Sequence, residues 1–386
     1  MDLLPGDDDP RRIAVRAWIN RHPHPTADEL ALAGYVAPRW PEPYGLGADP
    51  VHQLIIDEEL QRAGISRPSN PIGIGWAGPT ILFGGTDEQK KRYLPGVLSG
   101  AEFWCQLFSE PDSGSDLASL RTRAVRDGEE WVVNGQKIWT SGAQYSKFGI
   151  LLARTNADAP KHKGITYFIC PMDLPGIQIR PIKSMAGAES FNEVFFNDVR
   201  IPSANVVGDV NDGWRLAKVT LGNERVSLST GGVLWGYGPT ALDVIDLVRS
   251  MGGAKNHVMR QRVARLYTEH VLLEIIRMRT LTLRLRGQQP GPESSIRKII
   301  ADEHGQHAMA LARDLIGAHA MLTGDKDEAK KTLYNHTWYS GYMFSQALTI
   351  GGGTGEVQRN ILGERVLGLP HEPDPTAGMP WSQKSL

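Results

Sequence analysis

Residues 106–116 read Gln-Leu-Phe-Ser-Glu-Pro-Asp-Ser-Gly-Ser-Asp. This stretch separates two parts of the chain that differ in composition: helix signals precede it, and short β-rich runs follow it. Its proline, serines and glycine are typical of an exposed loop with many free backbone N–H groups. Taken alone, the stretch is equally compatible with a plain linker.

The zone before this loop carries signals of helix starts. Thr86 and Gln89 fit a capping box, in which each side chain bonds the backbone N–H group of the other residue. Asp49 followed by Pro50 marks another helix start. We therefore expect an N-terminal α-helical domain over residues 1–103.

The zone after it, residues 104–212, consists of short runs of β-branched and aromatic residues separated by turn residues. Asn134-Gly135 lies between two such runs and is a strong signal for a hairpin turn. Trp139 and Ser141 follow on the second arm, where they would offer an aromatic face and a hydroxyl group to a planar ligand. Alternatively, Trp139 is a buried core residue. Closely spaced short strands predict a small barrel or sandwich.

Helical periodicity returns in residues 213–386. Val263, Leu266 and Val271, for example, share one helical face. Long helices with short connections predict a bundle. The predicted fold class is therefore α+β and multidomain: helices, then a β-barrel, then a C-terminal helix bundle.

The composition is that of an ordinary globular protein. The 42 Lys and Arg residues nearly balance the 43 Asp and Glu residues, which gives no electrostatic signature for nucleic acid or an anionic membrane. We find no run of about 18 apolar residues, so no membrane insertion is expected. The acidic N-terminus lacks the apolar core of a signal peptide, and we expect a cytoplasmic protein.

Only two cysteines occur, Cys105 and Cys170, and both lie in apolar stretches. We expect them to be buried free thiols rather than a disulfide.

Two motifs are interpreted as structural. Gly73–Gly78 matches the GxGxxG pattern of dinucleotide-binding loops, but that pattern needs a preceding strand, and loop-forming residues precede it here. Glu303, His304 and His307 fall within one helical turn, yet further ligands are not evident, so we expect no metal site.

Two segments of the helical zone are further candidates. Residues 220–226 contain Glu224 and Arg225, which could also form a solvated helix surface. Residues 349–360 contain three successive glycines, which allow a backbone to approach a ligand closely, although an ordinary interhelical turn has the same composition.

In this order, these segments resemble the acyl-CoA dehydrogenase family across essentially the whole chain. The most specific elements are Ser-Glu-Pro followed by Gly-Ser-Asp within residues 109–116, and Asn-Gly-Gln-Lys-Ile-Trp at residues 134–139. The resemblance implies a C-terminal four-helix bundle, FAD as cofactor, an acyl-CoA substrate and an electron-transfer flavoprotein as electron acceptor. It also implies a homo- or hetero-tetramer.

The resemblance further implies roles for individual residues. Trp139 would pack beside the flavin ring, and Ser141 would bond near its N5 atom. The implied FAD-binding residues are Phe108, Ser109, Gly114, Ser115, Trp139, Ser141, Gln261, Thr354 and Glu356. The implied substrate-binding residues are Ser115, Arg225 and Gly352.

The chain departs from the family pattern at the catalytic base. Many members have a glutamate where this chain has Gly352. A minority, including isovaleryl-type enzymes, supply the base from the first helix of the bundle, and Glu224 matches that position. Residues 351–353 are all glycine and would leave space for a branched or bulky acyl group.

A second departure concerns the adenine end of FAD. The family's Arg-x-x-Phe-Gly is replaced by residues 250–254, and its Gln-x-x-Gly-Gly-x-Gly is absent near residues 322–325. Similar departures occur in heteromeric bacterial dehydrogenases that act on steroid side chains. Assembly with a second, different chain is therefore one expected form of the protein.

The expected reaction is α,β-dehydrogenation of an acyl-CoA thioester to the trans-2-enoyl-CoA. Glu224 would abstract the α-proton, flavin N5 would take the β-hydride, and the Gly352 N–H would help to stabilise the enolate oxygen. Two alternatives remain open: a flavin oxidase or monooxygenase on the same fold, and a non-catalytic partner subunit of a heteromeric enzyme.

Overall fold

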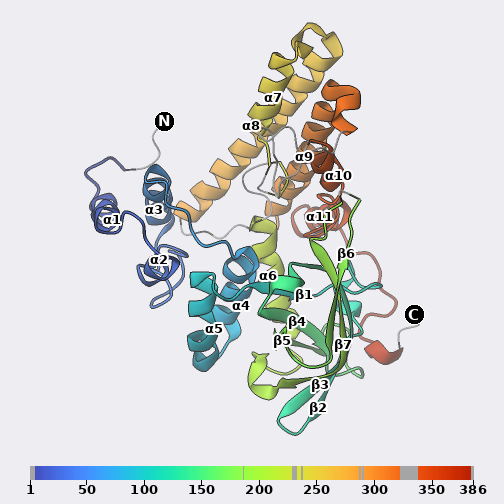
Figure 1. The fold of residues 1–386 in the computed structure, drawn as a ribbon. Helices are drawn as coiled ribbons and strands as arrows, with labels where there is room; N and C mark the ends of the chain where they lie inside the picture. Colours follow the sequence, from blue (N-terminus) through green and yellow to red (C-terminus); the bar gives the residue numbers. More distant parts are fainter. Residues whose placement is uncertain are drawn as a thin grey trace. The chain divides into compact units, whose positions relative to one another are not determined.

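The computed structural model describes residues 5–185, 187–227, 233–235, 238–286, 288, 291–321 and 338–383. The order predicted from the sequence is confirmed: N-terminal helices, a central sheet, then C-terminal helices (Figure 1). The chain divides into two compact units. Unit 1 comprises residues 1–182, 191–220 and 375–386, and unit 2 comprises residues 183–190 and 221–374.

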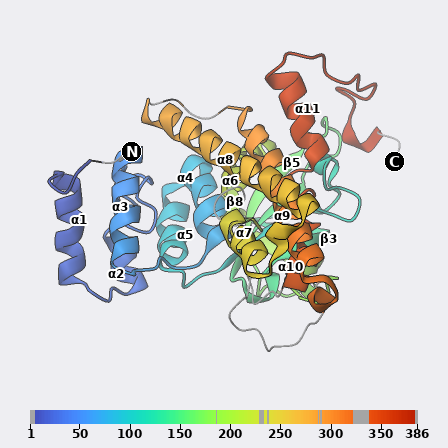
Figure 2. The ribbon, with the colours of Figure 1, turned by 90° about the horizontal axis from the view of Figure 1, so that it is seen from above.

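Unit 1 begins with helices whose ends follow local sequence signals. The capping box of Thr86 and Gln89 is confirmed at the start of α5, and Asp49 caps α3 as expected. α1 packs against α3, and Figure 2 shows these two helices side by side. The helices are α1 (Pro10–Arg21), α2 (Ala27–Leu32), α3 (Pro50–Arg62), α4 (Gly78–Gly84) and α5 (Asp87–Ser99).

The GxGxxG stretch is helical rather than a loop after a strand. Gly73–Ala77 form one turn of π-helix that leads directly into α4. A side chain at Gly78 would collide with the ring of Trp40, and one at Gly73 would collide with the side chain of Asn70. These glycines therefore serve close packing, in agreement with the structural interpretation.

The strands of unit 1 form one mixed sheet. Its strand order is β6-β7-β3-β2-β4-β5-β8, and β1 pairs with β4 in parallel. Its core contains Trp131, Phe168 and Phe196, and both cysteines are buried and free, as predicted. The strands are β1 (Trp104–Leu107), β2 (Arg123–Asp127), β3 (Glu130–Ser141), β4 (Phe148–Arg154), β5 (Ile165–Pro171), β6 (Ile177–Ile182), β7 (Phe191–Pro202) and β8 (Val206–Val207).

The predicted hairpin turn at Asn134-Gly135 is wrong. β3 runs without interruption through these residues, and the turn lies earlier, between Asp127 in β2 and Glu130 in β3. Gly135 instead sits at a register shift in the pairing of β3 with β7. A side chain there would meet the backbone of Thr122, so the close approach of another segment explains the glycine.

Unit 2 is helical, and α6 (Gly213–Ser227) enters it from unit 1. Its core includes Leu266 of α8 and Met309 of α9. Among the described residues, no helix is both long and apolar enough to cross a membrane. The remaining helices are α7 (Ala241–Ser250), α8 (His257–Leu285), α9 (Ser294–Ile316), α10 (Trp338–Ser345) and α11 (Gly355–Arg365).

Candidate functional site

Two of the sequence-predicted segments meet in unit 1. The backbone N–H group of Ile138 in β3 donates to the carbonyl oxygen of Ser109 at 2.9 Å. The loop that follows β1 therefore lies along the end of β3 that carries Trp139 and Ser141. The structure thus brings together candidate residues that are about thirty positions apart in the chain.

A β-bulge determines which side chains of β3 face outward. Lys137 pairs with Val194 and Thr140 pairs with Asn192, so two residues of β3 face a single residue of β7 between these pairs. Trp139 has a left-handed backbone (φ 60°) at this point. Its side chain is 58% exposed, whereas that of Thr140 is 1% exposed.

The bulge places Trp139 and Ser141 on the same outward face. Ser141 is exposed like Trp139 and pairs with Phe191 at the start of β7. The rings of Trp139 and Phe191 meet edge to face, with centroids 6.1 Å apart. A side chain this exposed is not a core residue, and bulky residues held in a left-handed backbone conformation cluster at ligand sites. The core alternative for Trp139 is therefore wrong.

The neighbouring residue Phe108 could offer a ligand its backbone but not its side chain. Its ring is buried and meets that of Tyr167 edge to face. Ser109 is partly exposed, and Gly114 and Ser115 are both exposed in the loop that follows. The side chain of Ser109, unlike that of Phe108, remains partly accessible to a ligand.

Sequence reasoning missed a buried ion pair beneath this loop. The ammonium group of Lys137 donates to a carboxylate oxygen of Glu110 at 2.7 Å and to the carbonyl oxygen of Phe108 at 2.9 Å. Lys137 is fully buried and Glu110 nearly so. Both residues belong to the motifs that carried the family resemblance, and a charged side chain at an inward-facing strand position was the available signal.

The candidate base, Glu224, lies in α6 of unit 2. It is buried, with 8% of its surface exposed. One helical turn earlier, the hydroxyl of Thr220 hydrogen-bonds with Thr80 at 2.8 Å and with Tyr167 at 3.1 Å, which fixes the preceding part of α6 within unit 1. The interpretation of this segment as a solvated helix surface is therefore wrong at Glu224. The side chain of Arg225 lies outside the described residues.

The glycine-rich segment of unit 2 is a tight loop before α11. Gly352 and Gly353 have left-handed backbones, with φ of 67° and 91°. The side-chain Nε2 of Gln358 donates to the carbonyl oxygen of Gly352 at 3.2 Å. Thr354 caps α11, because its hydroxyl accepts from the backbone N–H of Val357 at 3.2 Å. These hydrogen bonds fix the backbone of the loop, which leads directly into the N-terminus of α11.

The expected open space at the glycine triplet is wrong for Gly351. A side chain there would collide with the indole ring of Trp235, which also packs edge to face on Phe344. The ring of Trp235 therefore occupies the space that a larger residue at position 351 would need.

The remaining FAD candidates lie on two different helices of unit 2. Gln261 is exposed on α8, whereas Glu356 is exposed in the first turn of α11. Both helices pack on α9. Residues 250–254 cover the end of α7 and the start of a short 3₁₀ turn, and residues 322–325 lie outside the described part of the chain.

The histidines of α9 contact a carboxylate of α8. Nδ1 of His304 lies 3.2 Å and Nδ1 of His307 lies 2.9 Å from the carboxylate of Glu269 in α8. Glu303 instead forms an ion pair with Arg359 of α11. The described residues contain no group of three potential metal ligands.

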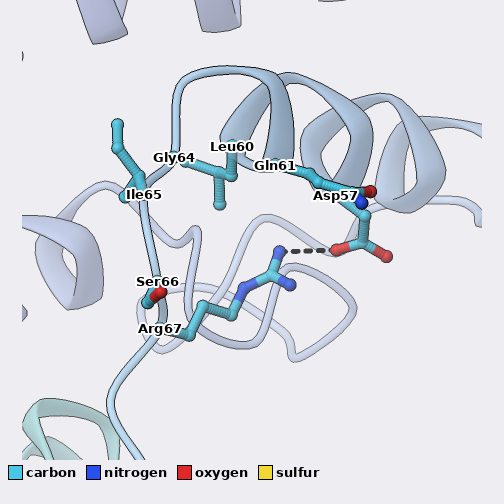
Figure 3. A pocket seen from close by; sticks show the side chains of 7 residues that line it. All are labelled: Asp57, Leu60, Gln61, Gly64, Ile65, Ser66 and Arg67. Atoms are coloured by element: carbon cyan, nitrogen blue, oxygen red, sulfur yellow. Dashed lines mark ion pairs between the residues drawn. The ribbon is translucent and has the colours of Figure 1, made fainter. Parts of the chain in front are cut away.

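A shallow pocket of about 390 Å³ lies at the end of α3 (Figure 3). Arg67 reaches into it, where its guanidinium forms an ion pair with Asp57 at 2.6 Å and donates to the carbonyl oxygen of Tyr35 at 2.6 Å. The charge of Arg67 is therefore neutralised within the protein. None of the residues that line the pocket is a candidate site residue. Its lining residues are Asp57, Leu60, Gln61, Gly64, Ile65, Ser66 and Arg67.

The site in unit 1 fits a flavin. An exposed indole ring and a hydroxyl group on one strand face suit a planar aromatic group with hydrogen-bonding edges. The neighbouring loop offers exposed backbone at Gly114, where the position of a side chain would be open space.

Three family models match this chain in order. They are the N-terminal domain of acyl-CoA dehydrogenase at residues 10–101, the middle domain at residues 105–199 and the C-terminal domain at residues 211–367.

Curated relatives agree with the family models. The chain is 45% identical over 344 residues to acyl-CoA dehydrogenase FadE34 of Mycobacterium tuberculosis (88% of this chain, 45% of that protein). It therefore spans less than half of that relative's length. It is also 40% identical over 363 residues to acyl-CoA dehydrogenase IpdE1 of the same organism (92% of this chain, 88% of that protein).

Solved structures agree as well. One is described as the Tcur3481-Tcur3483 steroid ACAD, with a TM-score of 0.77 and 29% identity (96% of this chain, 100% of that chain). The ChsE4-ChsE5 complex from Mycobacterium tuberculosis gives a TM-score of 0.73 and 30% identity, with the same coverage. The chain therefore belongs to the acyl-CoA dehydrogenase family, a family of oxidoreductases whose members are generally FAD-binding flavoproteins.

Proposed function

We propose that this protein is an FAD-dependent dehydrogenase that converts an acyl-CoA thioester to the trans-2-enoyl-CoA. The observation that carries the proposal is the bulge of β3, which presents Trp139 and Ser141 on one face beside the Ser109 loop. The ring combines 58% exposure with a left-handed backbone, and such backbone outliers cluster at ligand sites.

Each unit contains residues that are candidates to bind the cofactor. In unit 1 these are the backbone of Phe108 and the residues Ser109, Gly114, Ser115, Trp139 and Ser141. In unit 2 they are Gln261, Thr354 and Glu356. When bound, FAD supplies a hydride acceptor at its N5 atom.

Glu224 would remove the α-proton of the substrate. Its burial in α6 would keep water away from the carboxylate and restrict its orientation. The N–H group of Gly352, in a loop fixed by Gln358, would donate to the enolate oxygen that develops as the proton leaves. Arg225 would support the substrate.

The substrate is proposed to be a bulky or branched acyl-CoA, including acyl groups on steroid side chains. The description of one structural neighbour as a steroid ACAD supports this class. The ring of Trp235 occupies the space beside Gly351, and the side-chain amide of Gln358 occupies the space beside Gly353, so Gly352 is the remaining candidate of the triplet for substrate space.

The proposed assembly is a tetramer of one or two kinds of chain, with an electron-transfer flavoprotein as acceptor and a cytoplasmic location. Two neighbouring structures, the Tcur3481-Tcur3483 steroid ACAD and the ChsE4-ChsE5 complex, are each named for two proteins, which favours a heteromeric form. Within each chain, we propose three domains with boundaries at residues 1–103, 104–212 and 213–386.

The test is to purify the full chain, alone and co-expressed with a candidate partner chain of the same family, and to measure flavin by visible absorbance. Stoichiometric flavin that loses its visible absorbance under anaerobic conditions with a branched or steroid-derived acyl-CoA supports the proposal. No flavin in either preparation, even after FAD is added, would remove it. Rapid production of hydrogen peroxide without an added acceptor would favour the oxidase alternative.

A further inference from the structure

The buried pair of Lys137 and Glu110 links the two segments that form the candidate flavin site. Lys137 belongs to β3, two positions before Trp139, and Glu110 belongs to the loop directly after Ser109. The pair is 0% and 7% exposed. A buried ion pair of this kind stabilises the fold only weakly compared with apolar packing, so its position needs another explanation.

Both oxygens of the Glu110 carboxylate are used inside the protein. Oε1 accepts from Lys137 at 2.7 Å and from the backbone N–H of Thr122 at 2.9 Å, and Oε2 accepts from the backbone N–H of Arg121 at 2.6 Å. Burial raises the pKa of Glu110, but the charge of Lys137 and these hydrogen bonds outweigh it, so the pKa is lowered overall. Glu110 therefore closes the loop over residues 110–122 as a charged group.

A second buried cation holds the same loop near its end. The guanidinium of Arg154 in β4 donates to the carbonyl oxygens of Ala118 at 2.6 Å and of Leu120 at 3.3 Å. The loop that carries Gly114 and Ser115 is thus tied at both ends to charged side chains within the sheet.

Lys137 also fixes one peptide plane at the site. Its ammonium group binds the carbonyl oxygen of Phe108 at 2.9 Å, inside the protein. In a planar trans peptide, the carbonyl group and the next N–H group point in opposite directions. The N–H group of Ser109 is therefore directed away from Lys137. The next carbonyl, that of Ser109, is held by Ile138 at 2.9 Å.

We propose that Lys137 and Glu110 are positioning residues for the flavin, which set the peptide orientation at Phe108-Ser109 relative to the Trp139 face. The inference rests on the proposed function, because it assumes that a flavin binds there. Neither side chain reaches the ligand itself. They act through the backbone of Phe108 and Ser109.

The decisive variant is Lys137→Met, which keeps the length of the side chain and removes both of its hydrogen bonds. The matched control is Arg12→Met, which breaks another buried ion pair of unit 1, that of Arg12 in α1 with Glu59 in α3. Both variants are expected to lower the thermal stability of the holoenzyme. Only Lys137→Met is expected to weaken FAD binding, by about tenfold or more, the size expected for lost charge-assisted bonds.

The readouts are FAD released on dilution of the holoenzyme, measured by fluorescence, and the visible circular dichroism of the bound flavin, which reports its asymmetric surroundings. Equal FAD affinity and an unchanged dichroism spectrum in Lys137→Met would overturn the inference, whatever its stability. If Lys137→Met does not fold, Glu110→Gln, which removes the charge that holds the Lys137 ammonium group beneath Phe108, is measured in the same way, and wild-type values in both readouts overturn the inference. A wild-type chain that binds no FAD would instead refute the proposed function.

Discussion

Lys137 and Trp139 are two residues apart in β3, yet they lie on opposite faces of the strand: Lys137 is 0% exposed and Trp139 is 58% exposed. In a regular strand, residues i and i+2 share a face. The bulge between Lys137 and Thr140 shifts this alternation by one position. As a result, the lysine is directed inward, where it binds Glu110, and the indole ring is available to a ligand.

Replacing Trp139 by Ala should weaken FAD binding with little loss of fold stability. The ring is mostly exposed, so its removal leaves no large core cavity, and we expect stability to change by no more than about 1 kcal/mol. Stacking on an aromatic ligand contributes roughly 1 kcal/mol, which corresponds to about a fivefold change in FAD affinity. Fluorescence titration and thermal denaturation measure the two effects.

Trp139→Phe is the control for this prediction. It retains an aromatic face and should keep most of the affinity. If Trp139→Ala unfolds the protein while Trp139→Phe does not, the ring serves packing and the predicted ligand contact is wrong.

Sequence alone could predict those features that depend on near neighbours. The capping box of Thr86 and Gln89 is decided within four residues, and it is present. The hairpin predicted at Asn134-Gly135 is wrong, because this part of β3 pairs with β7 instead of forming a turn. β7 begins more than fifty residues later in the chain, so the local sequence does not indicate this pairing. The ion pair of Glu110 and Lys137 joins residues 27 positions apart, and no local pattern encodes their meeting.

The two cysteines should be inert towards thiol reagents in the native protein. Both are fully buried, and burial raises the pKa of Cys105 to about 12 and that of Cys170 further still. Because the thiolate is the reactive form, neither should react at neutral pH until the sheet unfolds. Two thiols that appear only on addition of denaturant would confirm this, and rapid labelling of the folded protein would contradict it.

Glu269→Gln should destabilise the protein at neutral pH. Burial raises the pKa of Glu269, but hydrogen bonds from His304, Arg265 and His307 outweigh it and lower the pKa from its ordinary value of 4.5 to about 2. A carboxyl whose pKa is lower in the folded state contributes stability above the pKa of the unfolded state. This contribution is at most about 3 kcal/mol.

The same contribution should disappear as the pH falls from 4.5 towards about 2. Urea denaturation at pH 7, 5 and 4 measures the difference in unfolding free energy between the wild type and Glu269→Gln. The difference should be smaller at pH 4 than at pH 5. Glu274→Gln, which breaks an exposed pair with Arg277 on the same helix, is the control and should change stability by less than about 1 kcal/mol. A pH-independent difference would show that Glu269 does not act through its charge.

Glu224→Gln should abolish flavin reduction by substrate while leaving the fold and FAD binding intact. Glutamine has nearly the same shape as glutamate but cannot accept the α-proton, and loss of a general base typically costs about 10²–10⁴-fold in rate. Single-turnover mixing of the flavin-loaded variant with a good acyl-CoA substrate measures this step directly, separately from the later transfer of electrons to an acceptor. Glu129→Gln, whose carboxylate is exposed at the turn before β3, is the control for loss of a negative charge and should react at the wild-type rate.

A second substitution tests independently whether Glu224 is the base. In many family members the base stands at the position of Gly352, so placing Glu there in the Glu224→Gln background should recover part of the lost rate. The left-handed backbone of Gly352 (φ 67°) is strained for any other residue, so recovery should be incomplete. If Glu224→Gln alone reduces its flavin at the unmutated rate, Glu224 is not the base. The proton must then be taken by another group of this chain or by a partner subunit.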